Sequence, residues 1–265
     1  MRPPQHLYKY RSLASDEDIL RARDIIVNNR IYFAAPSSFN DPFEGQVTIS
    51  FGAPLHHKFN FLTNYALDHG LQGSQANSWA TRVLENNIAE PEAHIHVELR
   101  DAFRNRAGIC TLSEINDDIL MWAHYSDSHK GICIEFTPVT FDHLKWFENS
   151  VPVTYQKEFP AVQYYKSCEG PTEKDALAAM ATKSVHWCYE KEWRLLRAKP
   201  GCYDLPGGVI SAVITGSAIS KEHTRLVHEW VALSRSKIDV YSTHITPGEY
   251  TLQIVSEFST DQARK

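Results

Sequence analysis

Strand-like segments occur in both halves of the chain, and helix-like segments separate them without strict alternation. Apolar residues alternate over residues 47–51, and residues 109–112 are apolar except for Thr111, which are two patterns typical of strands. Residues 15–28 instead repeat apolar side chains at helical spacing behind a start that resembles a capping box. Strict alternation would indicate a doubly wound parallel sheet, whereas this mixture favours an α+β fold with central mixed or antiparallel sheets.

The length of 265 residues suits one large domain or two small ones. We find no internal repeat and no low-complexity segment, and we predict a single α+β domain over residues 1–265. Residues 58–106 have a helical pattern that breaks near Gly70 and Pro91. We expect this stretch to form a helical insertion in the domain.

Charge and cysteine usage restrict the class of protein. The chain has 27 Lys and Arg against 32 Asp and Glu, a net charge of −5 that argues against broad binding of nucleic acid. Its five cysteines form no C-x-x-C pair, so neither a disulfide framework nor a zinc ribbon is indicated. We see no apolar leader and no stretch long enough to span a membrane, and we expect a cytoplasmic protein without a membrane partner.

The opening segment, residues 7–10, is aromatic and strand-like. Alternation along a strand places Tyr8 and Tyr10 on one face, with Lys9 and Arg11 on the other. A solvated edge strand is the structural alternative.

The loop Phe39–Gly45 combines turn chemistry with polar side chains. Asn40 and Asp41 precede a proline, where their side chains can cap nearby backbone N–H groups, and this explains them as turn residues. Glu44 is less well explained by a turn, so a structural role and a site are both open here.

A third segment places Trp122, His124 and Tyr125 at a helix end that leads into a buried strand. Such a cluster can stack on a planar ring and donate hydrogen bonds to it, although a satisfied core histidine is the alternative. Zinc could use His124 and His129, but no further ligand follows at familiar spacing, and we predict no metal site.

The strand predicted over residues 189–196 carries the best catalytic candidates. Its period of two places Glu190, Glu192 and Arg194 on one face. The arginine can orient a carboxylate and keep it ionised, which suits a general base or the stabilisation of a cationic sugar in a transition state. A charged, purely structural strand is the alternative.

Four segments together resemble the bacterial family called domain of unknown function 2971. They are LYKYRS, IYFAAPSSFNDPFEG, MWAHYSDSHKGICIEF and HWCYEKEWRLL, and their order and approximate spacing match over nearly the whole chain.

Their layout is also similar, more distantly, to ADP-ribosyltransferase-type folds, and this resemblance implies a split core of that kind. In those enzymes a first-strand cation or histidine holds the NAD ribose, a second strand bearing Ser or Tyr backs the nicotinamide, and a late glutamate bonds the ribose 2′-hydroxyl. The glutamate would be Glu192, or else Glu190, with Arg194 beside it. The segments that would bind NAD contain Tyr8, Lys9, Tyr10, Arg11, Ser37, Ser38, Asn40, Asp41, Trp122, His124 and Tyr125.

The resemblance therefore implies an ADP-ribosyltransferase or NAD glycohydrolase that uses NAD as substrate, with a role in phage defence or toxin systems. The acceptor macromolecule is not indicated. Two alternatives stay open: a non-catalytic sensor or binding module on the same scaffold, and a metal-dependent nuclease or phosphohydrolase. The metal-dependent enzyme would draw its ligands from Asp41, Glu44, His124, Glu190 and Glu192.

Overall fold

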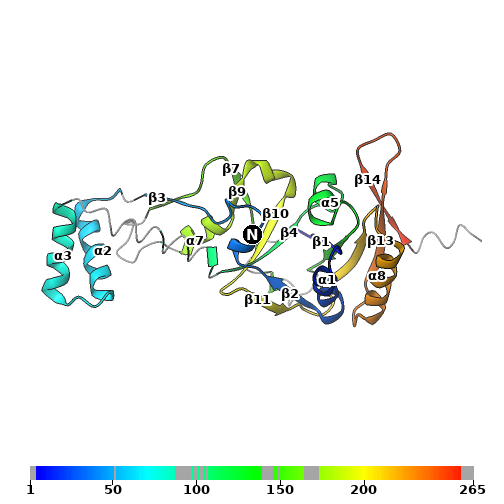
Figure 1. Cartoon of the computed structure of the whole chain (residues 1–265), viewed down its shortest axis with the longest axis horizontal. Coiled ribbons are helices and arrows are strands. Elements are labelled where there is room, and N and C mark those ends of the chain that lie inside the picture. Colours follow the sequence, from blue (N-terminus) through cyan, green and yellow to red (C-terminus); the bar gives the residue numbers. More distant parts are fainter. Residues whose placement is uncertain are drawn as a thin grey trace, which may run out of the picture. The chain divides into compact units, whose positions relative to one another are not determined.

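The computed structural model describes residues 4–50, 52–86, 97, 101, 104–105, 107–138, 146–147, 150–163 and 173–257. The chain divides into two compact units (Figure 1). The first unit consists of Met1–Ala34, Gly108–Val153 and His186–Lys265, and the second of Ala35–Ala107 and Thr154–Val185. The expectation of a single domain stays a prediction.

An eight-stranded sheet forms the frame of the first unit. Neighbouring strands of this sheet run antiparallel, except that β12 and β13 are parallel. Helix α8 (Lys221–Leu233) joins these two strands and is the crossover connection that a parallel pair needs. The mixed helices and sheets confirm the predicted α+β class. In spatial order the strands are β14 (Leu252–Ser256), β13 (Asp239–Ile245), β12 (Ile210–Thr215), β5 (Ile132–Phe136), β1 (Leu7–Arg11), β4 (Gly108–Ser113), β10 (Glu192–Arg197) and β6 (Ser150–Pro152).

Helices α1 (Asp16–Asn28) and α8 pack on one face of this sheet, where Ile25, Ile26 and Trp230 join its main apolar core. The predicted start of α1 is confirmed, because the Ser15 hydroxyl accepts a hydrogen bond from the backbone N–H of Asp18. After α1, strand β2 (Arg30–Phe33) pairs with β11 (Gly201–Asp204) in a separate two-stranded ribbon.

The short helix α5 (Ile119–Tyr125) packs on the opposite face. Its Met121 and Trp122 share a buried cluster with Tyr8 and Tyr10 of β1. The two tyrosines therefore lie on one face of β1, as strand alternation predicts.

The second unit contains shorter elements. Strand β3 (Thr48–Ser50) runs parallel to β8 (Ala161–Gln163), and β7 (Thr154–Gln156) runs parallel to β9 (Thr182–Ser184). The remaining elements are the one-turn helix η1 (Pro36–Ser38) and the helices α2 (Leu55–Asp68), α3 (Gly73–Glu85) and α7 (Glu173–Met180).

Helices α2 and α3 have a small apolar core of their own, made by Phe61, Leu62, Ala80 and Val83. The helical character predicted for residues 58–106 is confirmed as far as residue 85, and most of residues 87–106 lie outside the described residues.

The strand predicted over residues 189–196 is shorter than expected. A 3-10 helix, η3, spans Val185–Glu190, and β10 begins only at Glu192. Between them Lys191 has a positive φ of 43°, a left-handed conformation that ends the helical turn and cannot continue a strand ladder. Glu190 therefore precedes the strand on which it was predicted.

Candidate functional site

Strands β1 and β10 lie on either side of β4. Ser113 of β4 is opposite Tyr8 of β1 and also opposite Glu192 of β10. Two neighbouring inter-strand spacings amount to about 10 Å, so the opening strand and the late acidic strand lie close together in one sheet.

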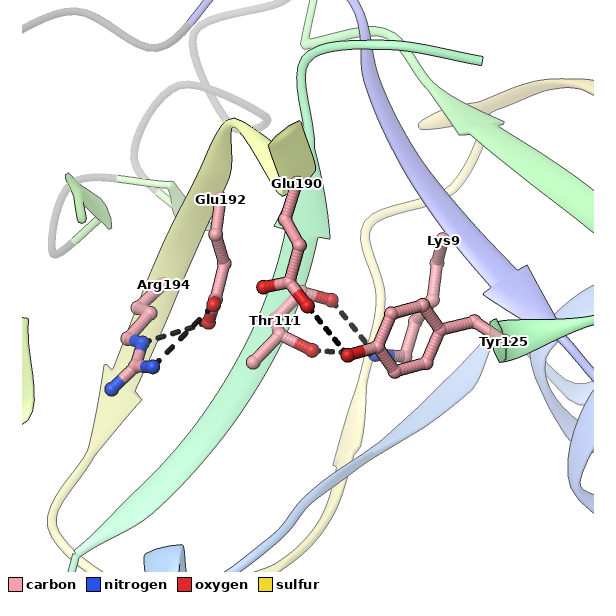
Figure 2. A network of polar contacts seen from close by, with 6 residues as sticks. All are labelled: Lys9, Thr111, Tyr125, Glu190, Glu192 and Arg194. Carbon is pink, nitrogen blue, oxygen red and sulfur yellow. Dashed lines mark hydrogen bonds and ion pairs between the residues drawn. The ribbon is translucent and has the colours of Figure 1, made fainter. Parts of the chain in front are cut away.

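Glu192 and Arg194 form a buried ion pair on β10 (Figure 2). The Arg194 Nε–H donates to the Glu192 Oε1 over 2.7 Å, and Nη2 lies 3.4 Å from Oε2. The side chain of Arg194 is 0% exposed and that of Glu192 is 4% exposed. They share one face of β10, because they are two residues apart on a strand. The guanidinium therefore orients the carboxylate and balances its charge, as the sequence analysis expected.

Glu190 lies close to the same end of β4, although it belongs to η3. Its carboxylate accepts a hydrogen bond from the Tyr125 hydroxyl over 2.5 Å, and its backbone oxygen accepts one from the Ser113 hydroxyl over 2.6 Å. The side chain is buried. The two glutamates thus differ in their surroundings, since Tyr125 adds no charge beside Glu190 whereas Arg194 adds one beside Glu192.

Lys9 reaches the same strand from β1. Its Nζ donates to the carbonyl oxygen of Thr111 over 2.8 Å and lies 3.5 Å from the Thr111 hydroxyl (Figure 2). Burial lowers the pKa of Lys9 to about 8; the Arg11 cation acts in the same direction, and the nearby Glu192 acts in the opposite one. Lys9 is therefore an ammonium group at neutral pH, held within electrostatic reach of Glu192.

The side chains of β1 divide between the two faces of the sheet. The register of β1, β4 and β10 puts Tyr8 and Tyr10 on the face of Glu192 and Arg194. Lys9 and Arg11 both start from the opposite face, where burial lowers the pKa of each, and from there the Lys9 Nζ reaches the backbone carbonyl of Thr111. The structure thus brings Lys9 to Thr111 but does not place Arg11 beside the glutamates.

Tyr10 and Trp122 are core side chains of this face. Their rings meet edge to face at 5.2 Å between centroids, and Trp122 is fully buried. The Tyr10 hydroxyl donates to the carbonyl of Ile115, and the Trp122 indole N–H donates to that of Asn116. Burial raises the pKa of Tyr10 and also that of Tyr8, where the charge of Glu135 adds to the effect. A ring enclosed in this way packs the core and offers no face to a ligand.

Tyr189 is a residue that the sequence analysis did not select. Its hydroxyl lies 3.0 Å from the Nδ1 of exposed His124, and their rings meet edge to face. Burial, followed by the charge of Glu190, raises the pKa of Tyr189 to about 12, so the phenol stays protonated. Together with half-buried Tyr125, these side chains form the more accessible aromatic border of the glutamates. The one signal in the sequence that could have indicated Tyr189 as a site residue was its position next to Glu190.

The remaining predicted binding residues belong to the second unit. Ser37 and Asn40 are exposed, and the Ser38 hydroxyl donates to the carbonyl of Ala35. The Asp41 carboxylate accepts a hydrogen bond from the Phe43 N–H over 2.9 Å, which is the turn contact that the structural explanation predicted. The structure does not group these four residues with the glutamates, and their role in binding NAD stays a prediction.

No group of three or more His, Cys, Asp and Glu side chains among the described residues is arranged to hold a metal ion. No helix within the described ranges is long and apolar enough to cross a membrane.

Comparison with curated proteins and with solved structures finds no significant similarity. A family model described as "Protein of unknown function (DUF2971)" matches residues 121–195. That segment contains most of α5, all of β5, both glutamates and Arg194, and it supports the family resemblance expected from the two later sequence motifs, whereas the two earlier motifs lie outside it. The part of the chain that builds the acidic end of the site is thus similar to the DUF2971 family model.

Proposed function

We propose that the first unit breaks the nicotinamide–ribose bond of an NAD-type nucleotide and passes the ADP-ribosyl group to water or to an acceptor hydroxyl. The observation that carries this proposal is the meeting of Glu190 and Glu192 at one end of β4, buried and held by different partners. Pairs of carboxylates in unlike surroundings are the usual equipment for cleaving glycosidic bonds.

The chemistry needs negative charge near the sugar. As the bond between the ribose C1′ and the nicotinamide nitrogen breaks, its electron pair leaves with nicotinamide and positive charge develops on the ribose. A preorganised carboxylate stabilises that charge. Glu192, oriented by Arg194, suits this role or a hydrogen bond to the 2′-hydroxyl.

Glu190 suits the proton transfer. The attacking water or hydroxyl forms the new bond to C1′ and gives its proton to a carboxylate, which must be fixed in place. Tyr125 fixes Glu190 by a neutral hydrogen bond. The Lys9 ammonium adds positive charge within electrostatic reach of Glu192, which would favour an anionic pyrophosphate nearby, and the accessible rings of Tyr125 and Tyr189 suit stacking on nicotinamide.

The test is turnover of labelled NAD by the purified full chain, with candidate acceptors present. Glu190→Gln keeps an oxygen that can accept the Tyr125 hydrogen bond, and we expect the folded variant, checked by its melting curve, to lose about 100-fold or more in turnover. Glu229→Gln is the matched control, because Glu229 is exposed on α8 and pairs only loosely with Arg225 at 3.6 Å. Undiminished NAD turnover in Glu190→Gln would contradict the proposal.

The same preparation separates the alternatives. A melting temperature that Mn²⁺ or Mg²⁺ raises and EDTA lowers again, without any response to NAD, would favour a metal-dependent hydrolase. A shift with NAD but no turnover would favour a binding module. A role in phage defence is part of our proposal on the strength of the family resemblance alone.

A further inference from the structure

A cavity of about 200 Å³ lies in the second unit, and no residue of the first unit lines it. Three segments line it: residues 41–46, the connection 156–160 between β7 and β8, and strand β9. The first of these contains the Asn-Asp-Pro-Phe-Glu motif, for which a turn explained the aspartate but not the glutamate.

Two phenylalanines form the lip of the cavity. Phe43 is 63% exposed and Phe159 is 45% exposed, and their ring centroids lie 6.3 Å apart with a tilt of 37°. Apolar side chains that gather at the mouth of a hollow are typical of binding sites. The two rings give the cavity an aromatic wall that is open to an incoming ligand.

The interior of the cavity is polar and charged. Glu44, Asp41 and Lys183 are 2%, 4% and 9% exposed, values that charged side chains reach only when they are held by partners. Exposed Glu158 and Lys157 complete the charged lining. The lining therefore contains three carboxylates and two ammonium groups, which give it a net charge of −1.

The volume limits the size of the ligand. A protein cavity of roughly 150 Å³ accepts a benzene ring, so about 200 Å³ accommodates one ring with a short substituent. The negative lining selects against an anionic substituent and in favour of a cationic one.

We propose that this cavity binds a single aromatic ring bearing a cationic amine or amidine. The ring packs against Phe43 and Phe159, and the cationic group faces the carboxylates of Asp41 and Glu44. The site goes beyond the proposed NAD chemistry and does not depend on it.

Ligand-observed NMR on the full chain tests the site with three probes of equal shape, namely benzamidine, benzamide and benzoate. We expect benzamidine to bind best and benzoate to bind about tenfold more weakly or less. Phe43→Ala and Phe159→Ala change exposed side chains and should weaken benzamidine about fivefold or more. Tyr250→Ala, which removes a 96% exposed ring from the first unit, is the control and should change nothing.

Two further variants test the charge. Glu158→Gln should weaken benzamidine and Lys157→Gln should strengthen it, each by about two- to threefold, because both side chains are exposed and their fields are screened. Absence of benzamidine binding, equal binding of benzoate, or aromatic variants that bind as the wild type does would each overturn the proposal. These binding measurements do not involve NAD turnover, so a result that overturns this proposal would not contradict the proposed function.

Discussion

Glu192→Gln is the substitution whose effect follows most directly from the structure. From the sequence alone we would expect this variant to lose activity while keeping its stability. Burial changes that expectation, because the fully buried Arg194 guanidinium would lose the charged carboxylate that accepts its Nε–H at 2.7 Å. Removing one member of a buried ion pair typically costs about 3–5 kcal/mol.

The amide oxygen of Gln still accepts a hydrogen bond, so we expect a loss in the free energy of unfolding of about 2–3 kcal/mol. For a chain of this size that loss corresponds to a fall in melting temperature of roughly 5–10 °C. Urea denaturation followed by tryptophan fluorescence measures it. Glu17→Gln is the control, since Glu17 pairs with Arg21 on the exposed side of α1 and should change stability by less than about 0.5 kcal/mol. A loss below about 0.5 kcal/mol in Glu192→Gln would refute the reasoning from burial.

Three further predictions concern stability. The pKa of Lys9 falls from its ordinary 10.5 to about 8 on folding, so the unfolded chain binds more protons than the folded chain between these pH values. The contribution of Lys9 to the free energy of unfolding should therefore rise with pH from about 8 to 10.5. Urea midpoints compared across that range should show this rise in the wild type and not in Lys9→Met. Asp41→Ala removes a turn-capping carboxylate and should cost about 1–2 kcal/mol in urea titrations while NAD turnover of the folded protein persists; full stability with lost turnover would reverse this assignment. Gly216→Ala should cost at least about 2 kcal/mol by the same measurement, because a Cβ there would lie 2.1 Å from the carbonyl oxygen of His129; Gly207→Ala, which meets open space, should change little.

The sequence predicted well those features that depend on a local period. Alternation placed Tyr8 and Tyr10 on one face, and the same rule paired Glu192 with Arg194. The start of α1 followed from the side chain of Ser15. Each of these needs only the residues within one turn or one strand.

Features that depend on backbone exceptions or on distant neighbours were not accessible. Lys191 adopts a left-handed conformation that its residue type rarely takes, and this moved Glu190 out of the strand. Trp122 was a plausible stacking residue until its burial was known, because the residues that enclose it come from other strands. The cavity beside Phe43 likewise needs residues that follow more than a hundred positions later in the chain, which no local pattern connects.

The place of β1 inside the sheet has a consequence for synthesis. Among the strands of this sheet β1 is synthesised first, yet its neighbours β4 and β5 follow only at residues 108–113 and 132–136, and β10 covers the far side of β4 only at residues 192–197. Pairing over such sequence distances is slow, and a nascent chain that stops short of residue 192 would present β4 as an open edge to other chains. Interrupted translation of this protein should therefore yield aggregates rather than a smaller folded product.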